Sequence, residues 1–151
     1  MPSKQQRFHN LRPFALSLLR LAVGFTFSLH GFQLVLGFFG GAHGAPAPLY
    51  SLVWFASILE LLGGLLLFFG VTTRPVAFVL SGEMAVAYFL AHFPKSVWPI
   101  ENGGELSALY AFVFLYLAVA GAGPISVEAL LNQRPATTSV QPAGVAAERS
   151  S

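Results

Sequence analysis

Residues 50–70 read YSLVWFASILELLGGLLLFFG, and this stretch decides the fold class. A helix that crosses a bilayer needs roughly 17–25 mostly apolar residues, and the stretch has that length and composition. Its single charged residue, Glu60, lies near the centre. An ionised carboxylate at that depth is costly, so such groups usually face a partner or a cavity. The stretch therefore predicts a membrane-spanning helix that carries a polar group with a task inside the bilayer.

Three further apolar runs have spanning length, at residues 14–39, 75–93 and 104–122. Of the 151 residues, 55% are hydrophobic and only 9% are charged, whereas a soluble domain carries about 25% charged residues. We therefore predict an all-α fold, an integral membrane four-helix bundle that leaves no room for a separate soluble domain.

The chain outside these runs is short and differs in composition. Residues 1–13 are predicted to form a basic cytoplasmic lead, with Pro13 at the start of the first helix. Residues 14–131 are predicted to form the membrane domain. Residues 132–151 are rich in Pro, Ala, Thr and Ser, which predicts a disordered cytoplasmic tail.

Basic residues indicate the orientation in the membrane. The chain opens with four of them and no acidic residue, and cytoplasmic segments are enriched in Lys and Arg. Four crossings then place most of the remaining basic residues on the same side, and one outside. The inner set is Lys4, Arg7, Arg12, Arg20, Arg74 and Arg134, and the outer residue is Lys95. Both termini are predicted to be cytoplasmic.

The polar residues inside the predicted spans fall at two depths, at a rise of about 1.5 Å per residue. An inner charge cluster would hold Arg20, with Glu60 or Glu83 as its partner. An outer zone would gather side chains that can donate or accept protons: His30, Gln33, His92 and Glu105.

Glu83 does not share a face with the other polar residues of its helix. At 100° per residue it lies opposite His92, beside Val79, Val86 and Leu90. Either this helix is buried on both sides, or Glu83 faces another subunit; the pattern leaves both interpretations open.

The absence of certain residue types excludes several kinds of chemistry. The sequence has no cysteine, which excludes disulfide exchange, thiolate nucleophiles and iron–sulfur ligation by this chain. No metal site and no covalently bound cofactor is predicted. No nucleic-acid partner is predicted either, because the basic residues follow the membrane topology rather than a phosphate track. A haem held by His30 and His92 is disfavoured because the two residues differ in predicted depth.

An ordered series of short motifs resembles the DoxX family of small bacterial membrane proteins. The resemblance covers about residues 14–131, and the order and spacing of the motifs carry it. They are Arg20 before Gly24, His30-Gly31-Phe32-Gln33, Gly37-Phe38-Phe39-Gly40-Gly41, Glu60-Leu61-Leu62-Gly63-Gly64, Gly70-Val71-Thr72-Thr73-Arg74, Asn102-Gly103-Gly104-Glu105 before Tyr110, and Gly121-Ala122-Gly123-Pro124-Ile125-Ser126. Two positions depart from the family pattern: Gln33 stands where many members have lysine, and Glu128 where aspartate is common.

The resemblance implies a bacterial inner-membrane protein with a quinone-linked role. The family takes its name from a subunit of a membrane thiosulfate:quinone oxidoreductase. We accordingly predict an accessory membrane subunit of a quinone-linked redox complex, not a complete enzyme alone, with quinone in the outer zone. The expected partners are the lipid bilayer, a redox partner protein and further copies of the chain.

Two alternatives of other classes stay open. The charge cluster of Arg20, Glu60 and Glu83 would suit a small transporter or proton pathway, although one protomer offers a narrow interior. In the other alternative, the protein is a non-catalytic membrane scaffold whose buried charges only fix the register of the helices.

Overall fold

A computed structural model describes residues 4–41 and 44–132, and its regular elements in that part of the chain are all helical. The all-α prediction is confirmed. The four longest helices are α1 (Lys4–Leu36), α2 (Leu52–Phe69), α3 (Thr73–Ala87) and α5 (Glu105–Ala120). The shorter elements are η1 (Phe38–Gly40), η2 (Tyr88–His92), α4 (Pro99–Asn102) and α6 (Val127–Asn132).

Three of these helical segments are long and apolar enough to cross a membrane. They are His9–Leu36 within α1, Leu52–Phe69, and the continuous run Thr73–His92 formed by α3 and η2. The fourth predicted span corresponds to α5, an apolar helix of 16 residues, which is shorter than the others. The protein is therefore a membrane protein with three clear candidate spans, and the crossing by α5 stays a prediction.

The first helix differs most from its predicted bounds. It begins at Lys4 rather than at residue 14, so Pro13 lies inside α1 and does not start it. It ends at Leu36, because Gly37 adopts the left-handed conformation with φ 73°. The predicted tail at 132–151 lies outside the described residues, except for Asn132, which ends α6.

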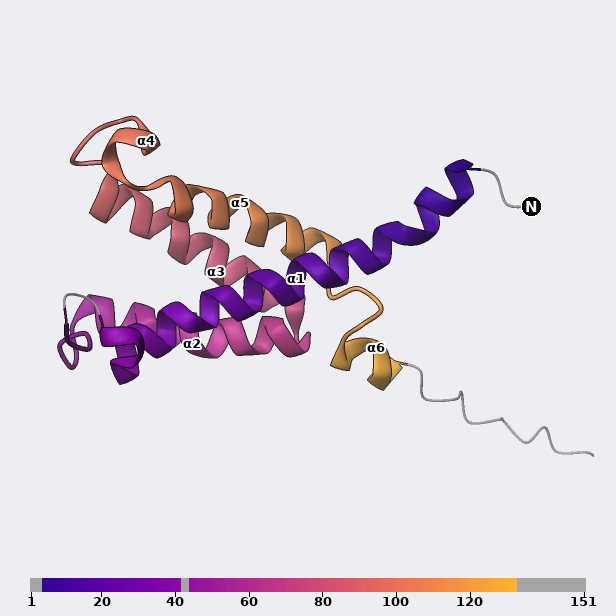
Figure 1. Cartoon of the computed structure of the whole chain (residues 1–151), viewed down its shortest axis with the longest axis horizontal. Coiled ribbons are helices and arrows are strands. Elements are labelled where there is room, and N and C mark those ends of the chain that lie inside the picture. Colours follow the sequence, from indigo (N-terminus) through magenta and orange to yellow (C-terminus); the bar gives the residue numbers. More distant parts are fainter. Residues whose placement is uncertain (1–3, 42–43, 133–151) are drawn as a thin grey trace, which may run out of the picture.

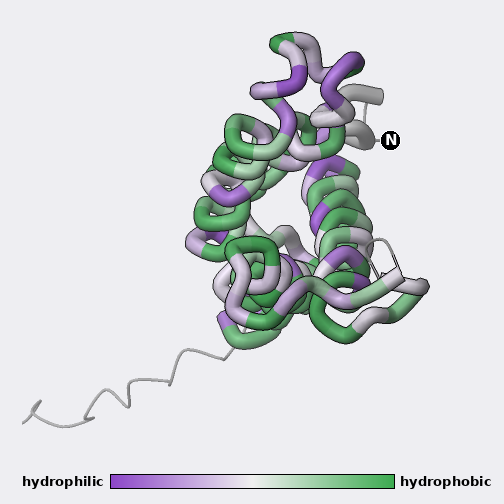
Figure 2. The backbone as a smooth tube through the Cα atoms, turned by 90° about the vertical axis from the view of Figure 1, so that its left-hand side faces the viewer, coloured by the Kyte–Doolittle hydropathy of each residue, from purple (hydrophilic) through white to green (hydrophobic). Residues whose placement is uncertain are grey.

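The long helices form two pairs, α1 with α2 and α3 with α5. Figure 1 shows the pairs converging near α6 and separating toward the end where η1 and α4 lie. We call these the joined end and the splayed end. Figure 2 views the molecule from the splayed end, where the pairs stand apart with hydrophobic residues along every long helix. The arrangement is two pairs joined at one end.

Glycines bring α1 and α2 into backbone contact. A Cβ atom on Gly24 would lie 2.5 Å from the Phe68 nitrogen, and one on Gly64 would lie 2.6 Å from the Ser28 nitrogen. Gly31 is equally close to Leu61, at 2.4 Å from its nitrogen. No larger residue fits at these positions without moving a helix, which is how small residues allow membrane helices to approach closely.

Arg20 holds the joined end together. Its buried guanidinium donates from Nε to the Ala122 carbonyl at 2.9 Å, and from its other nitrogens to three further backbone carbonyls. Those acceptors are the carbonyls of Leu67, Phe68 and Ile125. The side chain thus connects α1 to the end of α2 and to the segment after α5. A cation at the carbonyl end of a helix is also favoured by the helix dipole.

The predicted pairing of Arg20 with Glu60 or Glu83 is therefore wrong. Within the described chain, all its hydrogen bonds go to carbonyl oxygens. Two further contacts strengthen the joined end: Glu128 accepts from the backbone N–H of Thr73 at the start of α3, and Arg74 donates to the carbonyl of Val119 near the end of α5.

Candidate functional site

A cavity of about 710 Å³ lies between the two helix pairs. Its lining comes from α1, α2, α3, η2 and α5, and nearly all of it is apolar side chain. Small-molecule sites usually occupy about 300–1,000 Å³ and combine an apolar lining with a few convergent polar groups. The cavity therefore has the size and lining of a ligand site.

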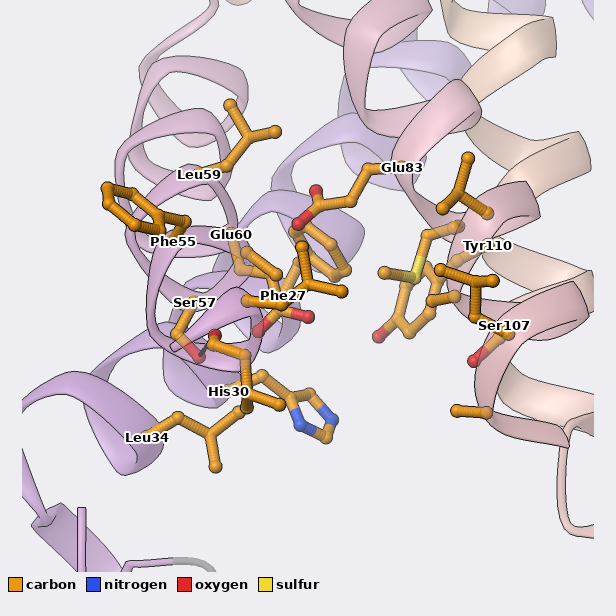
Figure 3. A pocket seen from close by; sticks show the side chains of 18 of the residues that line it. Phe27, His30, Leu34, Phe55, Ser57, Leu59, Glu60, Glu83, Ser107 and Tyr110 are labelled. Atoms are coloured by element: carbon orange, nitrogen blue, oxygen red, sulfur yellow. Dashed lines mark hydrogen bonds between the residues drawn. The ribbon is translucent and has the colours of Figure 1, made fainter. Parts of the chain in front are cut away.

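Two carboxyl groups enter this cavity from opposite walls. Glu60 extends from α2 and Glu83 from α3, and Figure 3 shows both carboxyl groups directed into the space. Glu60 Oε2 and both carboxyl oxygens of Glu83 are buried without a hydrogen-bond partner in the described chain. Among the described lining residues there is no lysine or arginine to pair with them. Unpartnered polar atoms of this kind call for an explanation.

The imidazole of His30 is a third polar group on the cavity. Figure 3 shows the ring of His30 pointing into the same space from α1. No described residue forms a hydrogen bond with this ring. Another polar lining group is already engaged, because Ser57 donates from Oγ to the Val53 carbonyl at 2.6 Å. The groups left to meet a ligand therefore include His30, Glu60, Glu83 and the hydroxyl of Ser107.

Helices α1 and α5 touch beside the cavity. The hydroxyl groups of Thr26 and Tyr110 lie 2.9 Å apart, and Thr26 also donates to the Ala22 carbonyl, so it can accept from Tyr110. The ring of Phe27 packs at 5.2 Å from that of Tyr110 and at 4.8 Å from that of Phe114. These contacts form a back wall at which the two pairs touch.

The opposite side, between α2 and α3, is open. Side chains that line the cavity there stay exposed, including Val53 and Phe55 on α2, Val86 on α3 and Leu90 on η2. These residues are all apolar. An apolar opening between two candidate spanning helices suits contact with lipid tails.

The structure brings together only part of the predicted outer zone. His30 and His92 both line the cavity, and His92 Nδ1 lies 3.1 Å from the Asn102 carbonyl oxygen. Gln33 donates to the Gly41 carbonyl at 3.1 Å and borders a separate groove of about 280 Å³ that also touches His30. Glu105 is exposed at the start of α5 and does not line the cavity.

The predicted inner cluster is divided differently. Glu60 and Glu83 share the cavity, whereas Arg20 belongs to the joined end. Glu83 faces the space between the pairs of its own chain, and the opposite face of α3 packs on α5, where Ser81 donates to the Ala111 carbonyl at 2.8 Å. The residues beside Glu83 on this face, Val79, Val86 and Leu90, are exposed, so both interpretations of Glu83 stay open.

The described residues contain no group of three or more His, Cys, Asp or Glu side chains placed to hold a metal ion. The predicted inner cluster already named Glu60 and Glu83, but not that they lie on facing walls of one cavity. The available signal was a single carboxyl group on the face of α3 formed by Val79, Val86 and Leu90, which otherwise suits lipid.

Comparison with known proteins identifies relatives of this chain. A Haemophilus influenzae protein without an assigned function is 42% identical over 123 residues, which cover 78% of this chain and 90% of that protein. The Escherichia coli inner membrane protein YphA is 28% identical over 131 residues, covering 80% of this chain and 93% of YphA. No solved structure matches. The DoxX family model matches residues 15–93, more than half of the chain, and the protein therefore belongs to the DoxX family.

Proposed function

We propose that this DoxX protein is an accessory membrane subunit of a quinone-linked redox system, and that its cavity holds a quinone head group. The observation that carries the proposal is the set of buried, unpartnered carboxyl oxygens of Glu60 and Glu83 inside an apolar cavity that opens between α2 and α3. A lipid-soluble ligand with polar acceptor atoms would fit both the lining and these groups.

The residues present suit a quinone on chemical grounds. In apolar surroundings without a lining cation, the protonated carboxyl is the form that costs less to bury. A protonated carboxyl donates one hydrogen bond, and a quinone carbonyl accepts one. His30 can donate from a ring nitrogen near the same space. Apolar lining residues would surround the ring, and a lipid tail would leave between α2 and α3.

When bound, a quinone supplies two-electron, two-proton redox chemistry at this site. The chain itself would bind and orient the head group, exclude water, and hold protons on Glu60 and Glu83. Carboxyl and imidazole groups within hydrogen-bond reach of a reacting oxygen are the usual sources of protons in such sites. Since the chain has no cysteine, an iron–sulfur cluster that exchanged electrons with the quinone would belong to a partner protein.

The proposed location is the bacterial inner membrane, with both termini in the cytoplasm. The relative YphA is named as an inner membrane protein, and the basic residues of the chain favour this orientation. The joined end would then face the cytoplasm, and the cavity would lie in the outer half of the bilayer.

A proton pathway is the second candidate, and the same unpartnered carboxyl groups favour it. Arg20 would not take part, because its guanidinium is held at the joined end by four hydrogen bonds to backbone carbonyls. Proteoliposomes that show proton flux in the wild type, and none in Glu60→Gln, would support this alternative.

Quinone content after purification tests the proposal. The protein is extracted in mild detergent from its native membrane, and bound quinone per protomer is measured in the wild type, His30→Ala and Glu105→Gln. We expect near-stoichiometric quinone in the wild type and in Glu105→Gln, which alters a residue outside the cavity, and a marked loss in His30→Ala. Absence of quinone from wild-type protein, including after incubation with added quinone, would contradict the proposal.

A further inference from the structure

We propose that Glu60 and Glu83 grip one head group from opposite walls, so that the bound ligand ties the two helix pairs together. The inference rests on the proposed function. In addition, Glu60 and Glu83 donate hydrogen bonds to the two carbonyl oxygens of the ring, and ligand binding draws the two helix pairs together.

Helices α2 and α3 touch where Leu80 of α3 packs on Gly63 of α2. Both residues are buried, and a Cβ atom on Gly63 would lie 2.7 Å from Leu80 Cδ2. The leucine thus packs on the bare backbone of α2. This contact marks how far α2 and α3 stay packed on each other as they run from the joined end.

Both carboxyl groups lie one helical turn beyond this contact. Glu60 precedes Gly63 by three residues, and Glu83 follows Leu80 by three residues. Because α2 and α3 run in opposite directions, both steps lead toward the splayed end, by about 4.5 Å. Glu60 and Glu83 therefore occupy the same level, where the two pairs begin to separate. Figure 3 shows their carboxyl groups entering the cavity from the two sides.

Beyond this level α2 and α3 do not cover each other. Val53 and Phe55 on α2, Val86 on α3 and Leu90 on η2 line the cavity and stay exposed. The contact between Thr26 and Tyr110 lies on the joined-end side of this level, because Ser28 of α1 faces Gly64 and Gly31 faces Leu61. A ligand between the carboxyl groups would add a bridge on the open side.

A quinone suits this bridge because its two carbonyl oxygens point away from each other across an apolar ring. Each protonated carboxyl has one hydrogen to donate, so two carboxyl groups on facing walls satisfy both oxygens. A cationic ligand would need ionised carboxylates instead. The two cases respond differently to substitution, because glutamine keeps a hydrogen-bond donor but cannot carry the negative charge.

The first test compares Glu60→Gln, Glu60→Met, Glu83→Gln and Glu83→Met, with Glu105→Met as the control outside the cavity. The readout is the dissociation constant of added quinone for detergent-purified protein that elutes as a single folded species. Each Met variant should bind about tenfold more weakly, the effect of losing one buried hydrogen bond, and each Gln variant within about threefold of the wild type.

Each contrary pattern has its own meaning. Loss in Glu60→Met with unchanged binding in Glu83→Met would overturn the two-walled grip while leaving quinone binding intact. Equal loss in the Gln and Met variants would show that negative charge is required, which also overturns it. A wild type that binds no quinone would refute the proposed function itself.

The second test measures the distance between the pairs directly. The cysteine-free chain accepts two spin labels, at Leu49→Cys before α2 and Ile100→Cys in α4, both exposed near the splayed end. We expect added quinone to shorten the mean distance between the two labels and to narrow the distribution of distances. Glu83→Met should abolish both changes. The labels at Leu49→Cys and Leu36→Cys, on one pair, should not respond. An unchanged distribution at saturating quinone would overturn the inference.

Discussion

The hydroxyl groups of Thr26 and Tyr110 lie 2.9 Å apart and join helix α1 to helix α5 across the interior of the protein. This bond connects the two helix pairs away from the joined end. Together with the packing of Phe27 on Tyr110, it brings α1 and α5 into contact beside the cavity, whereas the side between α2 and α3 is lined by exposed apolar residues.

Removing this bond should loosen the back wall without disturbing the fold. We expect Tyr110→Phe to lower the free energy of unfolding by about 1 kcal/mol, the typical value of a hydrogen bond between membrane helices. Tyr116→Phe, at an exposed position, is the control and should change nothing. Reversible unfolding in mixed micelles measures both. Equal stability of the two variants would show that the Thr26–Tyr110 bond contributes nothing.

The contact between α1 and α2 should be intolerant of a single methyl group. In Gly64→Ala the new Cβ would lie 2.6 Å from the Ser28 nitrogen, so the helices must separate, and we expect a loss of about 1–3 kcal/mol. Gly82→Ala is the matched control, because its Cβ would meet nothing within 4 Å. Thermal unfolding in detergent compares them; similar midpoints for the two variants would contradict the observed packing.

Arg20 should be required for stability rather than for chemistry. Lysine concentrates its donors on one nitrogen and cannot reach four separated carbonyls, so Arg20→Lys should lose about 2–3 kcal/mol. The exposed Arg12 provides the control, as Arg12→Lys. Yield of folded protein and its unfolding midpoint are the measurements. A fully stable Arg20→Lys protein that had lost quinone binding would instead place Arg20 in the functional site.

Cysteine accessibility decides whether α5 crosses the membrane. With both termini cytoplasmic, Lys95→Cys should react with a membrane-impermeant thiol reagent applied to spheroplasts, and Leu131→Cys should react only after permeabilisation. Both side chains are exposed, and the chain has no native cysteine to interfere. Reaction of Leu131→Cys in intact spheroplasts would mean three crossings and an external α6.

Much of the architecture could be predicted from the sequence, because length and hydropathy fix membrane helices strongly. The spans around Glu60 and Glu83 and the all-helical fold followed from composition alone. The start of α1 did not, since Pro13 is acceptable both at the first turn of a helix and, where a neighbouring group compensates, inside a membrane helix.

The site was harder to predict. Helical spacing shows which residues share a face of one helix, but not which other part of the chain packs against that face. Arg20 was assigned a carboxylate partner, yet it binds carbonyls of a segment about 100 residues away, which carry no signal in the sequence. Glu105 appeared close to His92 by depth, but it lies on the outside of α5. The shared level of Glu60 and Glu83 depends on how α2 and α3 pack, which only the structure shows.

Photolabelling shows where on the protein a quinone binds. Protein in proteoliposomes is irradiated with an azido-quinone, with and without excess unmodified quinone, and the labelled peptides are identified by mass spectrometry. Our account predicts labelling that the competitor suppresses, within the cavity-lining parts of α2 around Glu60 and of α3 and η2 around Glu83. Labelling confined to the exposed residues Phe112 and Leu115 of α5, or labelling that the competitor leaves unchanged, would contradict it.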